Sequence, residues 1–148
     1  MAKIAWIKSM SVGNKVLDEQ HKSIINYFND LDKMLSTKKS IDLAPVRKTT
    51  DFTYRYIKNH FAYEESCMKK VKMPGFKEHV KIHRTLIHLF GVFTKEFHNL
   101  YDKKYLSSIE LAKLLTKFER DVVKKYVFYM VKEIAHLKKY KGKLTSCP

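Results

Sequence analysis

The segments His60-Phe61-Ala62-Tyr63-Glu64-Glu65 and His79-Val80-Lys81-Ile82-His83 contain the residues that decide the fold. Each segment places two strong metal ligands four residues apart. On a helix, residues at i and i+4 lie on the same face, so each pair can bind one ion from one side. The two segments therefore predict neighbouring helices with a metal site between them.

Apolar residues recur at three- and four-residue steps through most of the chain, which is typical of amphipathic helices. A first helix is predicted over roughly residues 18–37, with Asp18 as its N-cap. A second begins near Pro45 and ends at Met73-Pro74-Gly75. A third runs to the polar loop 99–108, and a last helix follows Ser107 or Ser108 as its cap.

The fold predicted from this pattern is an all-α, up-down-up-down four-helix bundle. No strand pattern and no internal repeat is present in the sequence. Helices of this length joined by short loops pack antiparallel, with a site between facing helices. We expect one domain over residues 1–148, with an N-terminal arm (1–17) and a basic C-terminal tail (139–148).

The composition is that of a globular chain: 148 residues, 45% hydrophobic and 13% aromatic. No run approaches the ~20 apolar residues of a transmembrane helix, and the start lacks the pattern of a secretory signal. Cys67 and Cys147 do not form the cysteine framework of small secreted domains, which favours a reducing compartment. We therefore expect a soluble, cytoplasmic monomer.

Lysine and arginine number 30 against 15 acidic residues, a net charge of +15. This charge would suit nucleic acid or an anionic membrane surface. The sequence contains no RNP-like aromatic motif and no zinc-finger spacing. Because lysines are spread along the whole chain, we favour the interpretation that they cover solvated faces.

Five polar residues fall on stripes that otherwise consist of apolar side chains. They are His21, His60, Glu64, His79 and His83. Any one of these histidines alone would more often be a hydrogen-bonded core residue. Burying all five without partners would cost several kcal/mol for each group, whereas a bound cation satisfies them together.

Imidazole nitrogen combined with carboxylate oxygen suits iron, zinc, copper or nickel better than magnesium or calcium. Five ligands are too many for one tetrahedral zinc ion, so two metals bridged by Glu64 explain the number better. Ferritin-like di-iron bundles use two Glu-x-x-His motifs, and here only Glu133-Ile134-Ala135-His136 fits.

Three motifs, taken in order, resemble the hemerythrin family, and in particular its single-domain bacterial members. They are Asp18-Glu19-Gln20-His21-Lys22, His60-Phe61 with Glu64-Glu65 and Met68, and the pair His79 and His83, preceded by Trp6 and Val12-Gly13. The resemblance covers nearly the whole chain.

The resemblance implies a non-heme di-iron centre. His21 and His60 would bind one iron, His79 and His83 the other, and Glu64 would bridge them. In the family such a centre binds O2 reversibly, and members are associated with oxygen storage, delivery or sensing. The implied cofactor is therefore two irons, and the implied partner is O2 or a related small molecule such as nitric oxide.

The last helix departs from the family pattern, in which a His is followed five residues later by an Asp that supplies a second bridging carboxylate. Aligned on that pattern, Tyr126 stands at the His and Val131 at the Asp. Valine cannot bind a metal, which argues against ordinary reversible oxygen carriage. Tyr126 is either an iron ligand through its phenolate, which we favour slightly, or a core aromatic with a hydrogen-bonded hydroxyl.

Two other residues, Glu133 and Cys67, are candidates for additions to the site. Glu133 lies seven residues after Tyr126, roughly 10 Å further along a helix, so direct substitution for the missing Asp would require a bulge. We therefore expect a partly exposed Glu133 near the helix end. Cys67 could be a reactive thiol, but small hydrophobic packing is the better interpretation.

Three functions remain open at this point. The first is a di-iron protein that binds O2 or a related molecule for storage or sensing. The second is an oxidoreductase on the same scaffold that reduces peroxide or O2, which leaves the question of enzymatic activity open. The third is a basic bundle with an altered metal site that binds an acidic partner.

Overall fold

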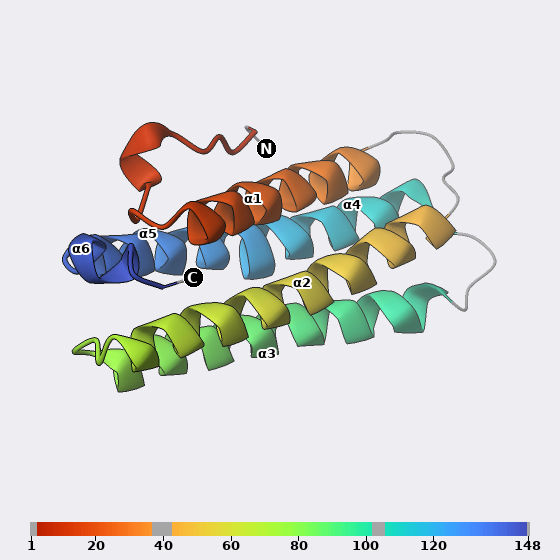
Figure 1. Ribbon diagram of the computed structural model, residues 1–148. Coiled ribbons are helices and arrows are strands. Elements are labelled where there is room, and N and C mark those ends of the chain that lie inside the picture. The colour runs from red at the N-terminus through yellow and green to blue at the C-terminus, as the bar shows by residue number, and fades with distance from the viewer. Residues whose placement is uncertain (1–2, 37–42, 102–105, 148) are drawn as a thin grey trace.

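Four helical rods make up the computed structural model (Figure 1), which describes residues 3–36, 43–101 and 106–147. Within those ranges every regular element is a helix. The elements are a 3-10 turn (Lys8–Met10), α1 (Lys15–Leu35), α2 (Leu43–Lys70), α3 (Phe76–Tyr101), α4 (Ser108–Lys117), a π-helical turn (Phe118–Val123), α5 (Lys124–Lys138) and α6 (Lys141–Leu144).

The rods pack antiparallel, and the predicted all-α bundle is confirmed. α2 packs against both α1 and α3, and α4, the π-helical turn and α5 form one continuous last rod beside α1 and α3. Figure 1 shows α6 at the end of the bundle where α1 begins, α2 ends and α3 begins. The second helix, predicted to begin near Pro45, is described from Leu43 onward, and residues 37–42 lie outside the described ranges.

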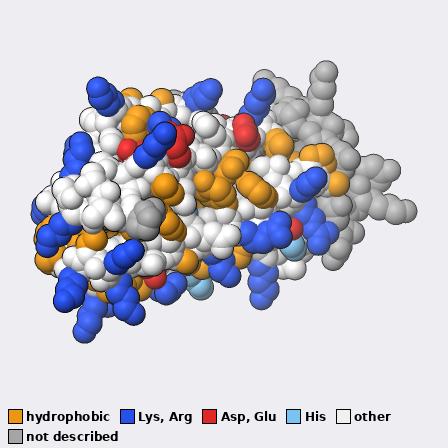
Figure 2. Space-filling view, viewed as in Figure 1, with side chains coloured by type: hydrophobic (Ala, Val, Ile, Leu, Met, Phe, Trp, Pro, Cys, Tyr) orange, Lys and Arg blue, Asp and Glu red, His pale blue; other side chains and the backbone are white. Residues whose placement is uncertain are grey.

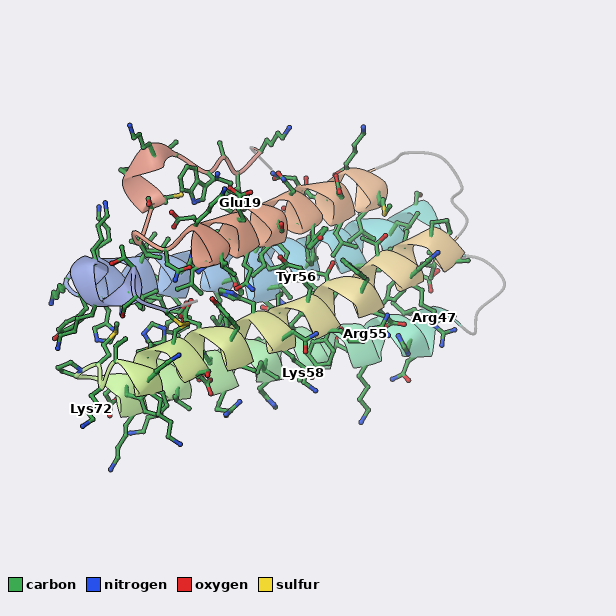
Figure 3. All side chains as sticks on the ribbon, in the orientation of Figure 1. Glu19, Arg47, Arg55, Tyr56, Lys58 and Lys72 are labelled. Atoms are coloured by element: carbon green, nitrogen blue, oxygen red, sulfur yellow. A yellow bond between two sulfur atoms is a disulfide. The ribbon has the colours of Figure 1, made fainter. Side chains whose placement is uncertain are left out.

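The core consists of the apolar stripes of the four rods. Its largest buried side chains include Phe28, Phe61, Phe90 and Phe118. Burying each such ring stabilises the fold by about 1.5–3 kcal/mol. Toward the margin, Tyr56 of α2 (labelled in Figure 3) faces α1, where its ring meets that of Tyr27 at 5.2 Å.

The first helix begins earlier than its apolar pattern predicted. Its N-cap is Asn14, whose side chain accepts a hydrogen bond from the Leu17 amide, so the prediction of Asp18 as N-cap was wrong. The Asp18 carboxylate instead accepts bonds from the Ser11 hydroxyl and the Val12 amide. Asp18 therefore holds the N-terminal arm against α1 instead of capping the helix.

The last rod begins as predicted, with a capping box. The Ser107 hydroxyl accepts from the Glu110 amide, and the Glu110 carboxylate accepts from the Ser107 amide. Ten residues later the helix widens into the π-helical turn Phe118–Val123, which the sequence pattern did not predict. Such a turn inserts one extra residue into a helix.

The C-terminal segment is joined to both α1 and α2. The Asn14 side-chain amide donates to the carbonyls of Leu144 and Cys147, and Leu144 is fully buried. Cys147 forms a disulfide with Cys67 of α2. The prediction that Cys67 is a simple packing residue was wrong, because the pairing joins positions 80 residues apart that spacing alone cannot connect.

This disulfide also removes one argument about location. The expectation of a reducing compartment rested on two cysteines without a framework, whereas a disulfide is typical of oxidising compartments. Among the described residues, none of the helices is long and apolar enough to cross a membrane.

Opening the disulfide is expected to destabilise the fold. A cross-link over 80 residues restricts the unfolded chain and is worth about 4 kcal/mol in the chain-entropy treatment. Urea unfolding of the wild type should therefore shift to lower midpoints when reductant is added. Cys147→Ser should unfold at the lower midpoint and ignore reductant; equal midpoints for all samples would contradict a structural disulfide.

Candidate metal centre

The Glu64 carboxylate lies at the centre of a buried cluster near the α6 end of the bundle. Its side chain is completely buried. Oε2 lies 3.3 Å from His21 Nε2 and 3.4 Å from His60 Nε2. Oε1 lies 2.7 Å from His79 Nε2 and 3.3 Å from His83 Nε2. Each oxygen of one carboxylate thus faces its own pair of imidazoles.

Three rods supply these residues, in the way that their spacing predicts. His21 comes from the second turn of α1, His60 and Glu64 from one face of α2, and His79 and His83 from one face of α3. All five side chains are at most 2% exposed. The structure thus brings all five side chains together in one cluster.

Contacts on the outer side of the rings fix the orientation of two histidines. His60 Nδ1 lies 2.7 Å from Gln20 Oε1, and His83 Nδ1 lies 2.9 Å from Glu65 Oε1. Because these oxygens only accept, each ring must donate its Nδ1–H outward. In a neutral ring the Nε2 lone pair then points into the cluster, as a metal ligand requires.

His79 is oriented by another histidine. His136 Nε2 lies 2.7 Å from the Pro74 carbonyl and must donate to it, so in the neutral ring His136 Nδ1 is an acceptor. His79 Nδ1 lies 2.9 Å from that atom and donates to it. In a neutral ring the lone pair of His79 Nε2 then faces Glu64 Oε1 at 2.7 Å, which only a proton or a metal ion at that nitrogen can stabilise.

Several buried atoms of the cluster have no hydrogen-bond partner. They are His21 Nδ1, His60 Nε2, His83 Nε2 and Glu133 Oε1. Unsatisfied buried polar groups are costly, and inward lone pairs facing a carboxylate repel it. A cation removes both costs, and this donor set fits a transition-metal ion.

The ligand atoms divide into two groups of metal-binding size that share one residue. Glu64, His79, His83 and Glu133 offer atoms within 4.8 Å of one another, and His21, His60 and Glu64 do the same. Because Glu64 belongs to both groups, two neighbouring ions fit the arrangement with this carboxylate between them.

The pKa shifts differ between the His21/His60 side and the His79/His83 side of the cluster. Burial lowers the pKa of His60 to about 3, although Glu64 opposes the shift. Burial also disfavours a charged His83, but contacts with Glu133 and Glu64 raise its pKa to about 10. Burial raises the pKa of the Glu64 carboxyl, and the surrounding imidazoles more than reverse this, so that it stays well below its usual range.

Comparison with known proteins agrees with this geometry. The family profile described as Hemerythrin HHE cation binding domain matches residues 12–127. This chain belongs to the hemerythrin family. The matched region contains all five clustered residues and ends within α5.

The curated relatives are hemerythrins of bacteria. The chain is 31% identical over 87 residues to a bacteriohemerythrin of Stenotrophomonas maltophilia, covering 59% of this chain and 55% of the relative. It is 30% identical over 98 residues to one of Pseudomonas aeruginosa, covering 66% and 61%. It thus spans less than two thirds of the length of these relatives. No solved structure matches the chain significantly.

Tyr126 and Val131, the two residues that the sequence aligns with the usual hemerythrin ligands, lie on different faces of α5. Tyr126 is buried between aromatic rings, 4.9 Å from Phe28 and 6.3 Å from Phe61 between centroids. Burial, together with the charges of Glu133 and Glu64, raises its pKa well above its usual value. Val131 lies on the outer face and is 55% exposed.

Glu133 is where the sequence-based prediction was wrong. Instead of a partly exposed residue it is 2% exposed, and its Oε1 lies 3.2 Å from His83 Nε2 and 3.9 Å from His79 Nε2. The error arose from placing the site at the level of Tyr126, because the spacing of Tyr126 and Glu133 along α5 is regular and the cluster lies at the level of Glu133.

Three further histidines lie outside the five-residue cluster. His88 is exposed, and His98 contacts Asp51 at 2.8 Å. His136 contacts His79, and the sequence did not identify Gln20 as the partner of His60. Gln20 directly precedes His21 in the sequence, and this position alone does not predict a contact with α2.

Gly75 lies at the point where the α2–α3 turn meets His136. Its φ is +78°, and a Cβ there would lie 2.8 Å from His136 Nε2. Gly75→Ala is therefore expected to cost at least about 1–2 kcal/mol through left-handed backbone strain, and to displace His136. Gly142→Ala, with no atom within 4 Å of the added Cβ, should be near neutral. Urea unfolding of both variants checks this; equal stabilities would contradict it.

Proposed function

We propose that this chain holds two non-heme iron ions and binds O2 or a related small molecule such as nitric oxide, for storage or sensing. The proposed ligands are His21, His60, Glu64, His79, His83 and Tyr126. The observation that carries the proposal is the division of the Glu64 oxygens between two imidazole pairs. Iron held there would supply coordination positions and electrons for a small ligand.

The protein itself would orient the imidazole rings and keep water out of the site. The outer partners Gln20, Glu65 and His136 hold the rings with Nε2 inward. Phe61 stacks on His83 with centroids 3.8 Å apart, and Met68 is fully buried. Such apolar surroundings exclude water and charged solutes, and they favour a small neutral ligand.

An oxidoreductase that reduces peroxide or O2 on this scaffold is the alternative that Tyr126 favours. Its ring lies 6.3 Å from that of Phe61 between centroids, and Phe61 stacks on His83 of the cluster. An iron-bound phenolate is a hard anionic ligand and stabilises Fe(III) over Fe(II). That preference would oppose a cycle that begins from two ferrous ions.

A second candidate function is docking to an acidic partner, which the charge distribution supports. Residues 1–17 and 122–148 carry ten lysines against one acidic residue, the buried Glu133, and so hold +9 of the net +15. Figure 2 shows basic side chains over the whole visible face, the α6 end included. Between arm and α5 lies an apolar groove of about 370 Å³ lined in part by Ile7 and Val131.

We also propose that residues 1–148 act as one domain and as a monomer. The cytoplasmic location stays a prediction that no longer has the cysteine argument behind it.

Metal analysis tests the main proposal. Chains purified after growth in iron-rich medium are expected to contain two irons each, and visible absorption should change between air and anaerobic dithionite. His21→Ala and His79→Ala should each lose one iron, because each belongs to a different group around Glu64.

The control is Lys58→Ala, an exposed change on α2 that should keep both irons. Spectral changes that reverse on deoxygenation would support O2 binding, whereas turnover with peroxide would support the oxidoreductase. A well-folded wild type that contains no metal would contradict the iron proposal and favour the acidic-partner function.

Tyr126→Phe separates ligation from packing. If the phenolate binds iron, the ferric protein should show a broad visible phenolate-to-iron band that the variant lacks, while fold and iron content stay close to wild type. Tyr129→Phe, a half-buried neighbour on the same helix, serves as the matched control. An unchanged spectrum in Tyr126→Phe would assign Tyr126 to the core.

A further inference from the structure

The burial pattern of the last rod changes register at the π-helical turn. Beyond Phe118 and Val122, the inward stripe continues through Tyr126, Met130, Glu133 and Leu137, with Val123 and Ile134 buried beside it. A regular α-helix, at 3.6 residues per turn, would continue the stripe from Phe118 through positions 122, 125, 129, 132 and 136. The observed inward positions after 122 are displaced by one residue.

This displacement has a physical reason. Without the extra residue, the inward positions would include Lys125 and Lys132, and two unpaired ammonium groups in the core are costly. The π-helical turn rotates the rest of the rod by one residue, about 100°. Both lysines then lie exposed, with Lys132 over the ring of Phe128 at 4.3 Å.

The same rotation brings an acidic residue of α5 onto the inward face. Position 131, where the family pattern has its carboxylate, is 55% exposed, and it lies off the inward stripe in a regular helix as well. Glu133 turns inward, with Oε1 3.2 Å from His83 Nε2. Both atoms are buried without a hydrogen-bond partner, so they are close together but not aligned with each other.

We propose that Glu133 is a metal ligand that completes the group of Glu64, His79 and His83, and that the π-helical turn brings it there. The inference rests on the proposed function and adds the carboxylate that Val131 cannot supply. Two carboxylates in place of one compensate more of the charge of two metal ions in a site closed to water. A carboxylate from the last rod is thus retained although it comes from a different sequence position.

The competing explanation is that Glu133 only balances a protonated His83. In that case Glu133→Gln would change the stability of the metal-free protein and leave metal affinity as it is. Metal affinity, measured separately from stability, therefore distinguishes the two roles.

The experiment is an anaerobic calorimetric titration with Fe(II), together with metal content per chain. The control is Asp121→Asn, which removes a carboxylate on the same rod that pairs with Arg120 outside the cluster. Wild type and this control are both expected to bind two ions with the same affinities. Glu133→Gln should keep the ion of His21 and His60 and bind the other at least tenfold more weakly. Should this variant fail to fold, Glu133→Asp, which keeps the charge and shortens the side chain, should show the same selective loss.

A double variant tests the register. Val131→Asp with Glu133→Gln restores a carboxylate at the family position, and it is expected not to recover the second ion because position 131 faces outward. Recovery there, or unchanged binding of both ions in Glu133→Gln, would overturn the inference while the proposed function stands. A wild type that binds no Fe(II) would instead remove the proposed function and this inference together.

Discussion

The buried carboxylate of Glu64 is the constraint on which the rest of the structure depends. A fully buried anion surrounded by four imidazoles is stable only if positive charge lies among them. Each rod that faces it must present a nitrogen at a fixed distance, which restricts how the helices rotate and slide. The bundle geometry and the cluster therefore determine each other.

A second layer of contacts makes this arrangement specific. Gln20, Glu65 and His136 each take the outer nitrogen of a different ring, and they come from α1, α2 and α5. Because the partner of each ring belongs to a different rod from the ring itself, the orientation of every such imidazole depends on helix packing. A shift of one rod relative to another therefore changes the orientation of the imidazole rings in the cluster.

The sequence predicted what depends on regular periodicity. The pairs His60/Glu64 and His79/His83 have helical spacing, and their apolar neighbours predicted both the bundle and the five clustered residues. Features outside that periodicity were missed. Asn14 caps the first helix because the arm occupies Asp18, and Glu133 enters the cluster through a π-helical turn. The Cys67–Cys147 pairing depends on where the chain end folds back, which local patterns do not encode.

Glu133 and His136 lie three residues apart on one helix, so the last rod touches the cluster both from within and from behind His79. A slip of this rod by a single residue would break both contacts in the same event. A misaligned α5 would therefore lose two polar contacts at once. In this bundle the polar contacts fix the register of the last helix, whereas apolar burial stabilises the fold without selecting one register.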